Sequence, residues 1–209
     1  TSSMFEEVHR YENVYLLKNK AYLPLGFLAE DALAQADFGE TDPWQMQNGV
    51  FSAATGLETP VWRAIAGSQV VALGNGTQVT EQSTRGKLSY SECDEGAYVS
   101  YFFSPNDEGF VCVWLDLPNR NDFVVCINGV ELYRETISLP QMLAVVDVTP
   151  TDSVEVRVLC DAGESGTMTV TASQLDNDLF FRGYDILNAA ALNITSFRQT
   201  RVEGTVDCD

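Results

Sequence analysis

Short runs in which apolar and polar residues alternate fill the chain from residue 61 onward. The runs are rich in Val, Thr, Tyr and Phe, and turn-forming residues separate them at intervals of roughly 8–12 residues, which is typical of antiparallel sandwiches and barrels. In one run Val154, Val156 and Val158 share one side of a strand, as a buried face requires. The pattern therefore predicts a mainly β chain, folded as an antiparallel β-sandwich of the jelly-roll or carbohydrate-binding-module-like type.

The segment VVCINGVELY carries the clearest local signal for a hairpin. Asn128 and Gly129 lie between two apolar-rich runs. Both positions of a two-residue hairpin turn need positive φ angles, which Asn and Gly adopt most readily. We therefore expect two antiparallel strands joined at this Asn-Gly turn.

The N-terminal sixty residues contain one well-marked helix. Asp42 is a good N-cap, Pro43 suits the first helical position, and Gly56 is a typical C-terminal stop. We therefore predict a helix of about three turns between Asp42 and Gly56. The first ten residues are polar and indicate a loose or helical start, whereas residues 13–19 and 21–28 indicate extended stretches.

The C-terminal part also contains a helix signal. Small apolar residues at helical spacing predict a short helix over residues 183–193 at the edge of the sandwich, after a strand-like aromatic run at 179–187. We expect residues 1–60 to form a small α/β elaboration on a sandwich of residues 61–209, the two making one structural unit. Because the chain starts at Thr1 and ends in a strand-like segment, we expect it to belong to a longer protein.

Two kinds of side chain are candidates for ligand binding. Helix formation alone does not explain the amides of Gln47 and Asn48, which either anchor neighbouring loops or face a ligand, and anchoring is favoured. Trp44, Trp62 and Tyr101 suit a platform on which sugars stack, although core packing in a sandwich uses the same residue types and is favoured. These five residues are the candidate binding residues.

The run AYVSYFFS carries aromatic residues on both sides of one predicted strand. This predicts a sheet with one buried face and one partly covered face. One side of the strand presents Tyr98, Ser100 and Phe102, and the other presents Val99, Tyr101 and Phe103.

The charge and the histidine content narrow the class of function. The net charge is −18 and the isoelectric point is about 4.2, so the chain repels nucleic-acid phosphates and anionic lipid. His9 is the only histidine, which argues against a histidine metal cluster and a Ser-His-Asp triad. Acidic residues at strand ends fit solvated turns better than a calcium site; they are Asp147, Asp152, Asp161 and Glu164. We predict no catalytic residue, no metal, no cofactor, no nucleic-acid partner and no lipid insertion.

The five cysteines form no C-x-x-C pair. Cys112, Cys126 and Cys160 lie in apolar strand-like runs, where a cysteine usually acts as a small buried hydrophobic residue. Cys93 and Cys208 lie in polar turns, and the sequence does not decide whether they form a disulfide with each other. The sequence has no signal peptide and no apolar run long enough to span a bilayer.

Two segments resemble a known family. The first is VYLLKNKAYLPLGFLAED, and the second is DPWQMQNGVFSAATGL. They resemble the extracytoplasmic C-terminal region of the YfhO family of bacterial multi-spanning membrane proteins. The matching positions of the first segment are Asn19, Pro24, Leu25, Gly26 and Phe27, and those of the second are Pro43, Gln47, Asn48, Thr55 and Gly56. Trp44 stands where the family tends to have Phe. The final segment TRVEGTVDCD and the Asn128-Gly129 hairpin are similar to the family's layout as well.

The resemblance implies a role at the cell envelope. Full-length members look like GT-C-type glycosyltransferases that use lipid-linked sugar donors, and some are implicated in decorating lipoteichoic acid. The catalytic acid of that architecture lies in the membrane part, so no catalytic residue is assigned to this chain. The chain then resembles a non-catalytic domain on the extracytoplasmic face of a Gram-positive cell membrane. Its partners would be the remainder of its own membrane-spanning chain and a cell-surface glycan or teichoic-acid acceptor.

Two other functions remain open. A carbohydrate-binding module of a secreted glycan-active protein would use the same sandwich and aromatic residues. A surface module that binds other proteins would use the acidic surface and the edge strands. Membrane-spanning segments in the same reading frame would favour the family assignment, whereas a signal peptide and soluble flanking domains would favour a secreted module.

Overall fold

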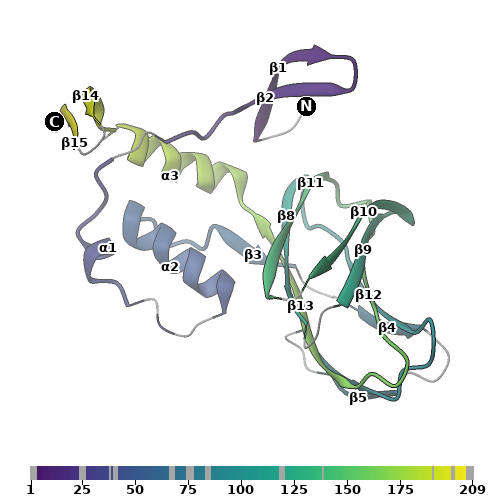
Figure 1. Ribbon diagram of the computed structural model, residues 1–209. Helices are drawn as coiled ribbons and strands as arrows, with labels where there is room; N and C mark the ends of the chain where they lie inside the picture. Colours follow the sequence, from purple (N-terminus) through teal and green to yellow (C-terminus); the bar gives the residue numbers. More distant parts are fainter. Residues whose placement is uncertain are drawn as a thin grey trace. The chain divides into compact units, whose positions relative to one another are not determined.

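The computed structural model describes residues 4–23, 27–37, 39, 42–65, 69–73, 78–82, 86–117, 121–137, 139–189, 191–198 and 201–205 (Figure 1). Contacts divide the chain into two compact units. Unit 1 contains residues 1–63 and 175–209, and unit 2 contains residues 64–174. Compact units are not the same as independently folding domains, so the division into residues 1–60 and 61–209 stays a prediction.

Unit 2 is built from two antiparallel sheets, which confirms the prediction of a mainly β, antiparallel sandwich. The five-stranded sheet has the order β10 (Val130–Ile137), β9 (Asn121–Ile127), β12 (Val154–Leu159), β7 (Tyr98–Phe103) and β4 (Gln69–Leu73). The second sheet has the order β11 (Gln141–Val148), β8 (Gly109–Asp116), β13 (Gly166–Leu175), β6 (Lys87–Ser91) and β5 (Gln78–Gln82).

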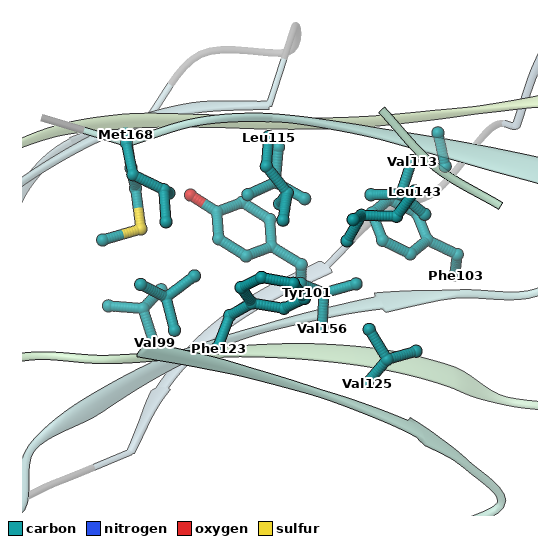
Figure 2. Packing of buried hydrophobic residues seen from close by; sticks show 14 of the residues in the cluster. Val99, Tyr101, Phe103, Val113, Leu115, Phe123, Val125, Leu143, Val156 and Met168 are labelled. Atoms are coloured by element: carbon teal, nitrogen blue, oxygen red, sulfur yellow. The ribbon is translucent and has the colours of Figure 1, made fainter. Parts of the chain in front are cut away.

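The core of unit 2 lies between the inner faces of these sheets. Figure 2 shows side chains of β7, β9 and β12 opposite Val113, Leu115 and Met168 of the second sheet. Val154, Val156 and Val158 are fully buried in this core, so the alternation read from the sequence is confirmed. Large apolar side chains that meet across about 10 Å between two sheets are what stabilises a sandwich.

The Asn128-Gly129 turn joins β9 and β10 as predicted. Asn128 has a φ of 52° and Gly129 a φ of 79°, and the two strands pair antiparallel. The Asn128 side chain also donates to Asp152 Oδ1 at 2.7 Å and accepts from the Ser153 N–H at 2.9 Å. The turn is therefore fastened to the loop that precedes β12.

Helix α2 (Pro43–Thr55) has the predicted ends. Asp42 accepts hydrogen bonds from the Trp44 and Gln45 N–H groups at 3.0 Å each, and Pro43 occupies the first turn. Gly56 ends the helix in the left-handed conformation with a φ of 71°. A residue with a Cβ is strained at such an angle, so glycine is the expected residue at this C-terminal end.

The expected start of the chain is wrong. Instead of a loose or helical lead-in, residues of β1 (Phe5–Tyr11) pair antiparallel with β2 (Val14–Asn19). All residues of β1 except Phe5 are exposed, and a mostly polar strand of this kind has no buried face from which it could be recognised in the sequence. The extended stretch expected over residues 13–19 is confirmed by β2. Asn19 ends β2, and its Oδ1 accepts from the Ala21 N–H at 2.9 Å in the turn that follows.

Helix α3 (Asn177–Ala189) begins earlier than the predicted helix, so the strand expected over residues 179–187 is wrong. Asp176 Oδ1 accepts from the Leu179 N–H at 3.0 Å and caps the helix start. Leu179 and Gly183 are buried one helical turn apart. Packing on α2 within unit 1 overrides the strand preference of the aromatic residues.

The remaining elements of the described chain are short. They are α1 (Ala32–Gln35), β3 (Trp62–Ala64), and the final pair β14 (Asn193–Arg198) and β15 (Arg201–Thr205). The final pair confirms the strand-like segment expected near the end of the chain. The motif residues Pro24 and Gly26 lie outside the described residues, as does Cys208.

Three cysteines expected to be buried are buried. Cys112, Cys126 and Cys160 are all thiols in unit 2. Burial raises the pKa of the Cys112 thiol to about 11, so it stays protonated at neutral pH. Cys93 is also a buried thiol, although the sequence indicated a polar turn.

Candidate functional site

The outer face of the five-stranded sheet combines aromatic and charged side chains. Tyr98, Ser100 and Phe102 of β7 alternate with core residues and therefore point to this face, as do Glu155 and Arg157 of β12. Ser100 is fully buried and Glu155 is 6% exposed, although both lie on the side away from the core. The partly covered face predicted from the sequence is therefore found on this sheet.

Glu155 is the centre of a hydrogen-bonded cluster on that face. Its Oε1 accepts from Ser100 Oγ at 2.6 Å and from Arg157 Nε at 2.9 Å. The Arg157 guanidinium lies over the Tyr98 ring, 4.7 Å from its centroid. A buried carboxylate requires such partners, and the pairing fixes both charged side chains on the sheet.

A pocket of about 400 Å³ opens at one end of this face. It is lined by Gly96, Ala97, Asn121, Asp122, Thr136, Leu159, Cys160 and Asp161. Asp122 and Thr136 lie opposite each other on β9 and β10, and the Thr136 hydroxyl donates to the Asp122 carboxylate. The pocket therefore offers two carboxylates and a hydroxyl. This volume is within the range of small-ligand sites.

The inner wall of the pocket is fixed by a polar network around Glu164. The Glu164 carboxylate accepts from Tyr90 Oη at 2.6 Å, from Asn121 Nδ2 at 3.1 and 3.2 Å, and from the Asp161 N–H at 2.8 Å. Burial is the largest cause of the raised pKa of the Tyr90 hydroxyl, and its hydrogen bond to Glu164 is the second cause. Asn121 is 3% exposed, and its Oδ1 has no hydrogen-bond partner among the described residues.

Three sequence-predicted binding residues come together in unit 1. The Trp44 and Trp62 rings lie 5.5 Å apart between centroids at an interplanar angle of 50°. Asn48 Nδ2 donates to the Trp62 carbonyl at 3.0 Å, and Asn48 Oδ1 accepts from the Trp62 N–H at 2.8 Å. The anchoring role expected for Asn48 is therefore observed. Ligand binding by Trp44, Gln47, Asn48 and Trp62 stays a prediction.

Tyr101 is not at a surface, which corrects its place among the candidate binding residues. Its side chain is fully buried between the sheets of unit 2, and Figure 2 shows the ring beside Phe123 with its hydroxyl towards Leu115 and Met168. Strand alternation points Tyr101 inward together with Val99 and Phe103. A ligand cannot stack on this ring while the sandwich is folded.

None of the five sequence-predicted binding residues lines the pocket of unit 2. A second pocket of about 310 Å³ in unit 1 also lacks them; it is lined by Leu28, Ala29, Glu30, Asp31, Ala54 and Ile186. From the sequence, Asp161 is expected to be only a solvated turn acid, and Asn121, Asp122 and Thr136 are not among the candidate binding residues. The polar pair Asn121-Asp122 at the start of an apolar strand was the available signal.

Metal ligands do not gather in the described part of the chain. No group of three or more His, Cys, Asp or Glu side chains there is arranged to hold a metal ion. Among the described residues, no helix is both long and apolar enough to cross a membrane.

The fold and the pocket define a β-sandwich module with a polar cavity at one end. A family model for the bacterial membrane protein YfhO matches residues 2–209. The chain belongs to the YfhO family of bacterial membrane proteins, as the sequence resemblance indicated. A search of curated proteins gives no match.

Several solved structures have a similar arrangement of strands over about half of the chain. A carbohydrate-binding module, TmCBM61 in complex with beta-1,4-galactotriose, is 11% identical with a TM-score of 0.35 and covers 52% of this chain and 89% of its own. CBM35 from Paenibacillus barcinonensis is 13% identical with a TM-score of 0.33, and the match covers 54% of this chain and 96% of the CBM35 chain. A family two carbohydrate esterase from Clostridium thermocellum, in complex with cellohexaose, is 11% identical with a TM-score of 0.33. The match covers 51% of this chain and 31% of the esterase chain. Similarities of this size carry no information about a ligand.

Proposed function

We propose that the chain is a non-catalytic accessory part of a multi-spanning YfhO membrane protein, and that unit 2 binds a glycan or polyol at the cell surface. The full-length protein would be a membrane glycosyltransferase, and the chain would lie on the extracytoplasmic face of a Gram-positive cell membrane. The acceptor would be a polymer such as lipoteichoic acid. Family membership supports the membrane context, and the pocket of unit 2 supports the binding role.

The chemistry of the pocket favours hydroxyl groups as its ligands. Asp122 and Asp161 present carboxylates, which accept hydrogen bonds from neutral hydroxyls and repel phosphates. The net charge of −18 adds a long-range repulsion of polyanions that salt screens. The pocket would therefore contact sugar or polyol hydroxyls of an acceptor polymer and leave its phosphates in solvent.

The binding proposal can be tested by NMR titration of the isotope-labelled chain. The ligands are neutral oligosaccharides and, separately, oligomers of glycerol phosphate at low and high salt. We expect shifts of the amide signals of Asn121, Asp122, Thr136 and Leu159, with neutral ligands binding at low salt. Binding of glycerol phosphate should strengthen as salt screens the acidic surface.

Variants of the pocket provide the matched control. Asp122→Asn and Asp161→Asn should weaken binding about 10- to 100-fold, as expected for a lost hydrogen bond to a charged group. Glu108→Gln changes the same charge at an exposed position that does not line the pocket and should leave binding unchanged. Shifts confined to residues away from the pocket, or none at millimolar ligand, would refute a binding role for unit 2.

The membrane context has a test of its own. The reading frame around these residues should encode several apolar segments of roughly 20 residues, enough to cross a bilayer. A signal peptide with soluble flanking domains would instead favour a secreted carbohydrate-binding module.

A further inference from the structure

Two buried thiols lie side by side at one end of the core of unit 2. Cys93 follows β6 and is 3% exposed, and Cys160 directly follows β12 and is 6% exposed. Both side chains belong to the same core cluster, and the Cys93 thiol is close enough to raise the pKa of the Cys160 thiol. Sixty-six residues separate the two positions in the chain, so the contact is a property of the fold and not of a local turn.

Backbone hydrogen bonds hold the two turns that carry these thiols against each other. The Cys93 N–H donates to the Glu164 carbonyl at 3.2 Å, and the Gly163 N–H donates to the Cys93 carbonyl at 2.6 Å. On the other side, the Cys160 N–H donates to the Ala97 carbonyl at 3.0 Å. The turn of residues 93–97 and the turn of residues 160–164 are thus fastened to each other at both cysteines, so a disulfide here would link two backbone segments that already lie together.

We propose that Cys93 and Cys160 form a disulfide that cross-links the turn after β6 to the turn after β12. Cys112 and Cys126 lie within strands β8 and β9, and neither shares this pair of linked turns. The sequence left open a disulfide between Cys93 and Cys208. The proposal instead pairs Cys93 with Cys160. It goes beyond the proposed function and does not depend on any ligand.

Oxidation of Cys93 and Cys160 to a disulfide needs a two-electron oxidant, and a low-molecular-weight disulfide can act as that oxidant. One thiolate attacks the disulfide of an oxidised low-molecular-weight dithiol or of glutathione, which gives a mixed disulfide and releases one thiol. The second thiolate then attacks the mixed disulfide, the protein disulfide forms, and the second thiol leaves. Together the two cysteines lose two protons and two electrons, and the oxidant gains them.

The surroundings of Cys160 indicate when this reaction occurs. Burial raises the pKa of its thiol, and the adjacent Cys93 raises it further. Little thiolate is then present in the folded protein, so the link forms while the chain folds and resists exchange afterwards. Cys160 and Ala97 also line the pocket of unit 2, so the link would fix one wall of it.

The test is oxidative refolding of the whole 209-residue chain. The chain is unfolded, refolded with reduced and oxidised glutathione, alkylated and digested, and its linked peptides are identified by mass spectrometry. We expect one linked pair, Cys93 with Cys160. The oxidised chain should melt about 5–15 °C above the reduced chain, since the cross-link closes a long loop of the unfolded state.

Two variants separate the proposed link from other effects of oxidation. The double variant Cys112→Ser with Cys126→Ser keeps both proposed partners and should keep the linked peptide. Cys160→Ser should lose the linked peptide and the difference in melting temperature. If a serine variant does not fold, the peptide map of the unchanged chain still decides the question. A Cys93–Cys208 peptide, any other pair, or no linked peptide would overturn the proposal.

Discussion

The side chain of Asn48 binds both backbone polar groups of Trp62, accepting from its N–H at 2.8 Å and donating to its carbonyl at 3.0 Å. At the start of β3, the Asn48 side chain thus supplies the two hydrogen bonds that a neighbouring strand would otherwise make with the Trp62 backbone. The contact joins α2 to a segment fourteen residues further along the chain and holds Trp62 beside Trp44. Helix formation does not require an amide side chain at this position of α2. The two hydrogen bonds to Trp62 explain why one is present there.

The first prediction concerns this contact. Asn48→Ala should lower the free energy of unfolding of unit 1 by about 1–3 kcal/mol, because a half-buried N–H and carbonyl lose their partner. Urea unfolding followed by tryptophan fluorescence measures the change. Gln45→Ala, at an exposed position of the same helix, is the control and should change the stability by less than about 0.5 kcal/mol. Equal effects of the two substitutions would show that the bonds to Trp62 contribute nothing.

The second prediction contrasts two buried tyrosines of unit 2. The Tyr101 hydroxyl is buried and has no hydrogen-bond partner among the described residues, whereas Tyr90 donates to Glu164 at 2.6 Å. Tyr101→Phe should therefore leave the stability unchanged or raise it by about 1 kcal/mol, because a buried polar group without a partner is removed. Tyr90→Phe should lower it by about 1.5–3 kcal/mol, because a bond to a charged group is lost.

Thermal or urea unfolding of both variants checks this contrast. A loss of more than about 1 kcal/mol in Tyr101→Phe would mean that the hydroxyl has a partner. An unchanged stability in Tyr90→Phe would mean that the Glu164 network does not stabilise unit 2.

The features that could be predicted from the sequence are the local ones. Asp42, Pro43 and Gly56 define α2 because capping and helix termination depend on residues within one turn of the helix end. Asn128 and Gly129 define a hairpin because only a few residue types adopt positive φ angles. Both predictions concern backbone conformation within a short segment, and neither depends on what packs against it.

The pocket could not be predicted in the same way, because it depends on register and on distant segments. Counting outward from the Asn128-Gly129 turn places Asp122 opposite Glu135, but the irregularity between Glu131 and Tyr133 shifts its partner to Thr136. No pattern in the sequence marks that shift. Asp161, which completes the lining, arrives from a turn after another strand. Likewise, the aromatic residues of α3 have strand propensity, but the Asp176 cap and the packing of α3 on α2 favour a helix.

The third prediction is a pH dependence at the turn before β12. Asp152 accepts from Asn128 Nδ2, the Thr149 N–H and the Thr149 hydroxyl at 2.7–2.8 Å, and these bonds lower its pKa, with that from Asn128 first. A lowered pKa in the folded state means that the contribution to stability is present above the unfolded pKa of about 3.9. It is lost as the pH falls from there through the folded pKa.

Unfolding measured between pH 2 and pH 7 tests this dependence. The stability difference between the unchanged chain and Asp152→Asn should be constant above about pH 5 and should shrink below about pH 4. Asn128→Gly removes the largest cause of the lowered pKa while keeping a residue that accepts a positive φ, so it should reduce the acid-dependent part. A difference that stays the same down to pH 2 would contradict the role given to Asp152.

The fourth prediction concerns the contact between α2 and α3. Gly183 packs so closely on Phe51 that a Cβ on it would lie 2.4 Å from Phe51 Cε2 and 2.5 Å from Cζ. An alanine in a helix interior normally stabilises it by about 1 kcal/mol relative to glycine. Here we expect Gly183→Ala to lower the stability of unit 1 by about 1–3 kcal/mol, because the ring must move in a packed contact.

A double-mutant cycle with Phe51→Leu separates the clash from the helix propensity. The smaller side chain gives the new methyl group room, so Gly183→Ala in the Phe51→Leu background should be neutral or stabilising. The coupling energy between the two positions should therefore exceed about 1 kcal/mol in urea unfolding. If Gly183→Ala alone stabilises the chain, the two helices are not in contact at this point, and the early start of α3 at Asn177 must be attributed to its Asp176 cap alone.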